Sequence, residues 1–207
     1  MSLSALEVQA LKVAPATEGV LPVFHERWSS RSFAPRAVSD ADLQRIFEAT
    51  RWAASAYNEQ PWRFVVGRKG TETFKAIYDS LIGFNQEWAG EAPVLILGLA
   101  LAKFSHNGTQ NSYALYDLGA ATAQLTLQAA ALGMTTHQMA GFDHDKARTL
   151  VGIPEDHLLG SVTALGYQGE PSALSNEKLL SMETSARTRK PLAEIVFSSW
   201  GESEKLS

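Results

Sequence analysis

Residues 112–132 have the sequence SYALYDLGAATAQLTLQAAAL, which is the longest periodic stretch of the chain. Its apolar side chains fall on nearly every face of the helix that the spacing predicts, and Gly133 can end that helix as its C-cap. A helix that is apolar on all sides must be covered on all sides. We therefore expect it at the centre of a domain or in a subunit interface, with the other elements packed around it.

The flanking segments predict a sheet and its covering helices. A short, partly β-branched apolar run bounded by Pro93 predicts a buried strand at residues 93–101. Further strands are predicted at 64–66, 159–167 and 192–197. Helices are predicted at 40–52, 71–81 and 144–151. Ser39 is the expected N-cap of the helix at 40–52, and Asp143 starts the helix at 144–151. Residues 170–190 are polar and are predicted to be irregular. This order indicates an α+β or α/β sheet flanked by helices.

Composition sets limits on partners and location. The 207 residues carry a formal charge of −4 and include no cysteine. The mild acidic balance argues against a nucleic-acid partner, and the missing thiols exclude disulfides, thiolate metal sites and a cysteine nucleophile. Residues 92–102 form the longest strongly apolar run, which is too short to span a bilayer, and residues 1–20 lack a signal-peptide pattern. We expect a cytoplasmic protein with no membrane partner: one domain over 21–207, after an N-terminal arm or helix at 1–20.

Several common catalytic and binding signatures are absent from the chain. It has no GxGxxG, no GxxxxGK[ST], no HExxH and no GxSxG. Its five histidines are scattered along the sequence, and surface or core positions are the simpler explanation for them. We predict no metal site and no catalytic side chain.

Three polar clusters remain as candidates for function. Two guanidinium groups and a hydroxyl could clamp a phosphate at Arg27-Trp28-Ser29-Ser30-Arg31, although solvated surface arginines are the simpler explanation. The loop at 55–64 could hydrogen-bond a planar heterocycle, or could be a plain helix–strand connection. The basic stretch at 187–191 could be a further anion contact or a solvated turn.

Together and in this order, the clusters resemble the nitroreductase family of FMN-dependent oxidoreductases. Residues 27–33, followed by the helix capped at Ser39, are similar to the family's opening pattern, and residues 54–62 are similar to its Ser-Asn-Gln-Pro-Trp loop. The series continues with residues 83–88 ahead of 92–96, then 117–133, 165–167 and 187–192. The resemblance covers about residues 21–197, and weak motifs that occur together in one order make a specific signal.

The resemblance implies an α+β fold with a central, mostly antiparallel sheet flanked by helices, in an intertwined homodimer with FMN at the subunit interface. It implies that the phosphate, the ribityl chain or the pyrimidine edge is held by Arg27, Trp28, Ser29, Arg31, Arg187 and Arg189. Ser55 and Asn58 would reach the isoalloxazine from the partner subunit. Asn85 would contact the polar edge of the ring, and Gly141, next to Ala140, would bring a backbone N–H to flavin N5.

The implied activity passes hydride from NADH or NADPH through bound FMN to a nitroaromatic, a quinone or a related conjugated small molecule, by a ping-pong mechanism. The chain departs from better-studied members at four positions. Trp28 stands where a basic residue or His is often found, and Ala54 stands where Pro is common. Trp88 stands where some members have a lysine near the flavin, and Ala140 where some have Glu. Because Trp88 and Ala140 could close the face on which substrates stack, the alternative is a non-catalytic FMN-binding or flavin-storage homodimer.

Overall fold

The structure, a computed structural model, describes residues 3–205. Its helices are α1 (Ala5–Lys12), α2 (Pro22–Glu26), α3 (Asp40–Arg51), α4 (Glu72–Ser80), α5 (Gln86–Ala89), α6 (Ala114–Ala131), α7 (His144–Val151) and α8 (Glu177–Thr184). Its strands are β1 (Trp62–Arg68), β2 (Val94–Leu101), β3 (Thr135–Met139), β4 (His157–Gly166), β5 (Phe197–Ser199) and β6 (Glu202–Ser203). Strands and helices alternate from β1 to β4, but neighbouring strands of the sheet are antiparallel, so the fold is α+β.

A four-stranded sheet lies at the centre, in the order β1-β2-β4-β3. All three pairings are antiparallel: Trp62 lies opposite Ala100, Val94 opposite Leu165, and Thr135 opposite Gly166. Every residue of β2 but the last is buried, because the strand has a neighbour on each side and helices over both faces. The expected central antiparallel sheet flanked by helices is confirmed.

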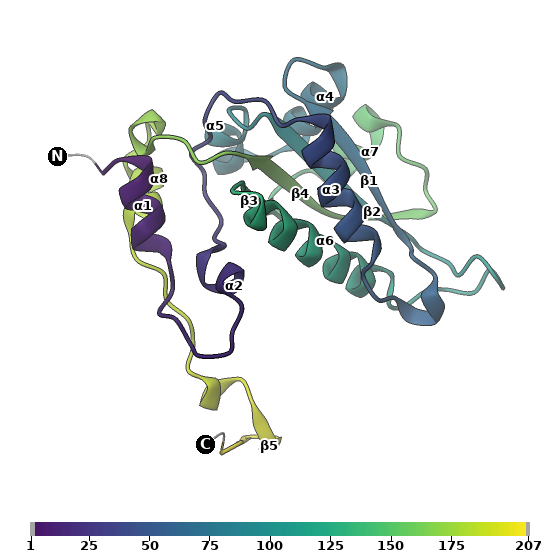
Figure 1. The fold of residues 1–207 in the computed structure, drawn as a ribbon. Coiled ribbons are helices and arrows are strands. Elements are labelled where there is room, and N and C mark those ends of the chain that lie inside the picture. The colour runs from purple at the N-terminus through teal and green to yellow at the C-terminus, as the bar shows by residue number, and fades with distance from the viewer. Residues whose placement is uncertain (1–2, 206–207) are drawn as a thin grey trace.

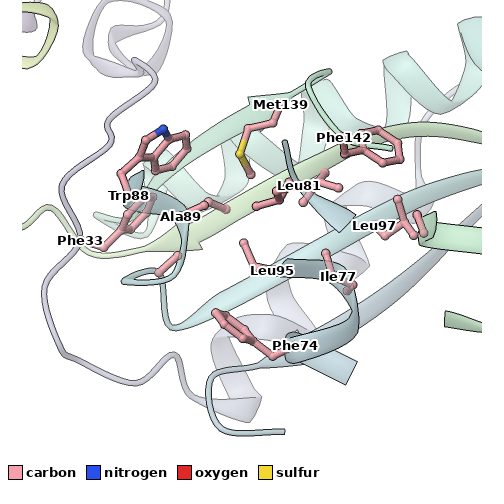
Figure 2. Packing of buried hydrophobic residues seen from close by; sticks show 14 of the residues in the cluster. Phe33, Phe74, Ile77, Leu81, Trp88, Ala89, Leu95, Leu97, Met139 and Phe142 are labelled. Carbon is pink, nitrogen blue, oxygen red and sulfur yellow. The ribbon is translucent and has the colours of Figure 1, made fainter. Parts of the chain in front are cut away.

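Successive residues of β2 point to opposite faces of the sheet and belong to different parts of the core. Leu95 and Leu97 pack with the side chains of α4, α5 and α7 (Figure 2). Val94 and Ile96 pack with α3 and α6 on the other face. The sheet is therefore the middle layer of three, and Figure 1 shows α3 and α6 running across it.

Helix α6 buries one face and leaves the other open in the single chain. Leu118, Ala121 and Leu125 are buried against the sheet, whereas Leu115 is 47% exposed and Tyr116 is 76% exposed. The sequence predicts a helix that is covered on every side, but a single chain covers only one side of α6. Of the two expected locations, the exposed apolar face favours a subunit interface over complete burial in the domain.

Local signals set the helix ends, at Ser39, Asp143 and Gly133 as predicted. Ser39, Thr71 and Asp143 each accept a hydrogen bond from a backbone N–H in the first turn of the helix they precede, which satisfies one otherwise unpaired donor. Gly133 takes a φ of +73° directly after the last turn of α6, a conformation that glycine adopts without a steric penalty. The predicted helices at 40–52, 71–81 and 144–151 are confirmed to within about one turn.

Two predictions about local structure are wrong, and one strand was missed. Residues 170–190 are not wholly irregular, because they contain α8. Its buried side chains are Leu179 and Glu183, and one buried apolar residue is too few to produce a helical pattern in the sequence. Residues 192–197 do not form a strand: a short 3₁₀ turn at Leu192–Glu194 precedes β5. Strand β3 was not predicted, since its sequence Thr-Thr-His-Gln-Met is mostly polar and is strand only because β4 pairs with it.

The two ends of the chain leave the sheet and run together (Figure 1). Helices α1 and α8 pack side by side, and the segment that ends in β5 and β6 extends away from the body of the molecule. No helix within residues 3–205 has the length and apolar character needed to cross a bilayer. The division of the chain near residue 20 stays a prediction.

Candidate functional site

Basic side chains from both ends of the chain line one hollow beside the edge strand β3, here called the arginine pocket. Its lining residues are Lys12, Arg27, Trp28, Ser29, Arg31, His137, Met182, Arg187 and Arg189. The structure thus brings together all six residues predicted from the first and third polar clusters. It adds Lys12 from α1 and His137 from β3, which the sequence analysis missed.

The stretch 27–33 positions the first cluster. Burial alternates from residue 27 to residue 32: Trp28, Ser30 and Ser32 are buried, while Ser29 is exposed and Arg31 is half-buried. This period of two is typical of extended backbone, which places Ser29 and Arg31 on the pocket side. The His137 ring nitrogen Nδ1 lies 3.1 Å from the Ser30 carbonyl oxygen and connects the stretch to β3.

The guanidinium groups of Arg27 and Arg31 are available for an anion. Within residues 3–205 neither group hydrogen-bonds to the protein, and neither does the Ser29 hydroxyl. Burial lowers the pKa of both arginines, and the nearby charge of Arg189 lowers the pKa of Arg27 further. Both stay charged near neutral pH because the ordinary pKa of arginine lies far above neutrality. Crowded cations without partners favour a bound anion.

Arg187 has a partly structural role. Its Nη1 donates to the Arg27 carbonyl oxygen at 2.6 Å, and its Nη2 donates to the His25 carbonyl oxygen. These bonds fasten the C-terminal stretch to the end of α2. Its Nε is buried and finds no partner in the described part of the chain, so this donor also favours a ligand in the pocket. Arg189 is exposed, and its Nη1 donates to the Thr188 carbonyl oxygen.

Asn85 and Gly141 meet where the chain leaves β3. The Asn85 side-chain amide donates to the Gly141 carbonyl oxygen at 3.0 Å, and a Cβ at residue 141 would lie 2.8 Å from the same amide nitrogen. Only glycine fits this approach without a shift. The Gly141 N–H makes no hydrogen bond within residues 3–205, and Ala140 next to it is exposed. Strand β3 connects this pair to the arginine pocket, because His137 lies four residues before Gly141.

Ser55 and Asn58 do not reach the arginine pocket within one chain. Ser55 lines a separate hollow with Tyr113, Tyr116 and Asp117, at the N-terminal end of α6. Trp28 lines a hollow with Ala130 and Gly133 at the other end of α6, and a helix of 18 residues is about 27 Å long.

The backbone of the loop that holds Ser55 and Asn58 is strained. Tyr57, Asn58 and Gln60 have φ values of +53°, +55° and +50°. Such left-handed non-glycine residues cost on the order of 1–3 kcal/mol each and cluster at functional sites. The loop therefore stays a candidate binding element, at a distance from the pocket of its own chain.

Trp88 does not line an open face. It is 2% exposed and packs against Phe33 (Figure 2), with ring centroids 6.2 Å apart. It also packs against His137, with ring centroids 4.6 Å apart. The expectation that Trp88 could close a substrate face is therefore wrong, because its side chain points into the core. Trp28 is also buried, and the Lys12 ammonium lies 4.6 Å from the centroid of its ring.

Comparison with known proteins gives a consistent picture. The model of the nitroreductase family matches residues 25–87 and 80–167. An NADH dehydrogenase of Thermus thermophilus is 30% identical, over 74% of this chain and 91% of the relative. A major NAD(P)H-flavin oxidoreductase of Aliivibrio fischeri is 41% identical over a short stretch, 22% of each chain. The crystal structure of an oxidoreductase containing FMN superposes with a TM-score of 0.84 and 31% identity, covering 92% of this chain and 97% of the other.

Proposed function

The chain belongs to the nitroreductase family, and from that premise we propose that it is an FMN-dependent oxidoreductase that uses NADH or NADPH. The similar structure that contains FMN and the relatives named for NADH and NAD(P)H support this activity. The observation that carries the proposal is the arginine pocket, where Arg27 and Arg31 have no protein partner within residues 3–205.

The residues of the pocket fit FMN. A phosphate monoester carries up to two negative charges and accepts several hydrogen bonds, and arginine binds it bidentately. Arg27, Ser29 and Arg31 would hold that phosphate, with the buried Arg187 Nε as a further donor and Arg189 at the rim. No glycine-rich loop is needed, because these side chains supply the donors that such a loop would otherwise provide.

The protein's part in the reaction is to bind and orient. When bound, FMN accepts hydride from the nicotinamide and passes it on, which is chemistry that no side chain has to supply. The free Gly141 N–H and the Asn85 amide that is fixed against Gly141 would hold the polar edge of the ring. The closed core around Trp88 excludes water behind this edge.

We infer that the working unit is a homodimer. The exposed face of α6 is apolar at Leu115 and Tyr116, and the C-terminal segment carries exposed apolar side chains that have no core of their own: Leu192 (59%), Ile195 (56%), Phe197 (38%) and Trp200 (96%). Surfaces of this kind favour burial against a partner. A second copy would also supply Ser55 and Asn58, which the chain keeps at the far end of its own α6.

We propose a nitroaromatic, a quinone or a related conjugated compound as acceptor. It would enter after the nicotinamide has left, which gives ping-pong kinetics. The alternative, a non-catalytic FMN-binding or storage homodimer, rested on Trp88 and Ala140. Trp88 no longer supports it, because its side chain lies in the core. Ala140 is exposed and small, so the surface beside Gly141 stays open.

One anaerobic experiment separates these functions. Purified protein loaded with FMN is mixed with NADH or NADPH, and the flavin absorbance is followed. We expect rapid bleaching with at least one nucleotide, and recovery when a quinone is added. A flavin that stays oxidised with both nucleotides refutes the reductase and favours storage, whereas a protein that does not retain FMN refutes both.

A further inference from the structure

A fully buried carboxylate, that of Glu183, lies directly behind the arginine pocket. Glu183 is in the last turns of α8 and is 0% exposed. A carboxylate at this end of a helix is unfavourable, because the unpaired carbonyls there carry partial negative charge. A buried charge is also costly unless it is paired and hydrogen-bonded. This placement therefore needs a compensating network.

The network consists of donors from the stretch that holds Ser29 and Arg31. Oε1 of Glu183 accepts from the Ser30 hydroxyl at 2.6 Å and from the Ser32 N–H at 3.2 Å. Oε2 accepts from the Arg31 N–H at 3.0 Å. The side-chain amide of Gln168, which follows β4, donates to Oε1 at 3.2 Å. One carboxylate thus ties three consecutive residues to α8.

These bonds determine which way the pocket side chains face. With Ser30 and Ser32 held inward, the alternation of extended backbone turns Ser29 and Arg31 outward, into the arginine pocket. No other side chain within residues 3–205 hydrogen-bonds to the Arg31 N–H. Ser32 is also held by Glu170, whose carbonyl oxygen accepts from the Ser32 hydroxyl at 2.6 Å. Glu183 is thus the side chain that fixes the backbone of Arg31 itself.

Glu183 also compensates the crowding of positive charge. The Lys12 ammonium donates to the carbonyl oxygens of Met182, at 2.9 Å, and Ser185, at 2.5 Å, on either side of Glu183. Burial lowers the pKa of Lys12 and of Arg31, and the negative charge of Glu183 acts against this in both. The carboxylate thus helps these cations to stay charged beside one another.

We propose that Glu183 is a positioning residue that gives the arginine pocket its preference for a phosphate monoester. This inference rests on the proposed function, because it assumes that the pocket takes the FMN phosphate. Glu183 does not touch the ligand, and its effect passes through the backbone of Ser30, Arg31 and Ser32.

The test compares FMN with riboflavin, which has the same ring and ribityl chain but no phosphate. Each is titrated by flavin fluorescence into the flavin-free protein and into Glu183→Gln. A glutamine amide has one acceptor oxygen, which would take the place of Oε1 and its three donors. Its NH₂ group would then face the Arg31 N–H, so that two donors meet. We expect the affinity ratio of FMN to riboflavin to fall at least about tenfold, the scale of one misplaced charge-assisted contact. A purely structural role would weaken both flavins alike and leave the ratio unchanged.

Matched variants separate the remaining explanations. Glu177→Gln removes the same charge from an exposed position of α8 and should leave the ratio unchanged. If Glu183→Gln does not fold, Ser30→Ala, which removes the shortest bond and leaves the charge, decides the matter with an expected fall of about threefold. A ratio that stays at the wild-type value overturns the positioning role. A wild-type protein that binds riboflavin as tightly as FMN overturns the proposed phosphate site itself.

Discussion

The folded protein should lose stability in mild acid because of His137. The ring lies between the Ser30 carbonyl, 3.1 Å from Nδ1, and the Trp88 indole, with ring centroids 4.6 Å apart. Burial, together with the nearby charge of Arg31, lowers the pKa of His137 to about 4. At neutral pH the ring is therefore uncharged, with Nδ1 donating to Ser30.

The sign follows from proton binding. The folded pKa is about 4 and the ordinary histidine value is 6.5, so between these values the unfolded chain holds a proton that the folded chain lacks. Stability is therefore complete above the unfolded pKa and is lost as the pH falls toward the folded one. The loss between pH 7 and pH 5 is about 2 kcal/mol, from the linkage of about 1.4 kcal/mol per pKa unit.

The variant His137→Asn tests this, since its amide can still donate to Ser30 but cannot be protonated. Unfolding free energies of the flavin-free proteins are measured by urea titration at one protein concentration, at both pH values. We expect the advantage of wild type over the variant to shrink by about 2 kcal/mol at the lower pH. His144→Asn, on an exposed residue of α7, is the control and should show no such change. An advantage that is equal at both pH values would refute the burial of a neutral ring.

Other perturbations test the pocket, the dimer and the fold. Arg27→Ala and Arg31→Ala should each weaken FMN retention by about 1.5–3 kcal/mol in equilibrium dialysis, and full flavin occupancy in both variants would contradict the phosphate clamp. Deletion of residues 191–207 removes the exposed apolar segment and should shift sedimentation from dimer toward monomer, whereas an unchanged dimer would rule out its role. Ser39→Ala removes the α3 N-cap and should lower the unfolding free energy by about 1 kcal/mol in a urea titration, so an unaltered midpoint would show that the cap contributes nothing.

The fold was predictable where local chemistry and packing agree. Ser39 and Asp143 cap their helices as their sequence context indicates, and the apolar run around Leu95 forms the central strand. Strand β3 was not predictable from its own residues, because a polar segment such as Thr135–Met139 becomes a strand only through pairing with β4. Helix α8 was hidden for a similar reason: its buried side includes Glu183, whose carboxylate is stabilised there by hydrogen bonds from residues 30–32 and Gln168.

The candidate site was predictable in its residues but not in its assembly. The motifs around Arg27 and Arg187 named most of the lining of the arginine pocket, and the resemblance to a family joined them. Lys12 and His137 carried no signal, since a single lysine or histidine says nothing until the fold brings it to the pocket. Trp88 was misplaced for the converse reason: an aromatic residue at a motif position can face either the core or the ligand.

The sequence by itself determined the family, the central helix and the chemistry of the basic clusters, because these depend on residue types and on spacing over short distances. The tertiary structure alone decided which side of α6 is left open, which strand forms the edge of the sheet, and which donors have no partner. It alone brought Glu183 to residues 30–32, more than one hundred positions away along the chain. Such contacts form when a long loop closes. The entropy cost of closing a loop grows only slowly with its length, so the local sequence pattern does not show which distant residues will meet.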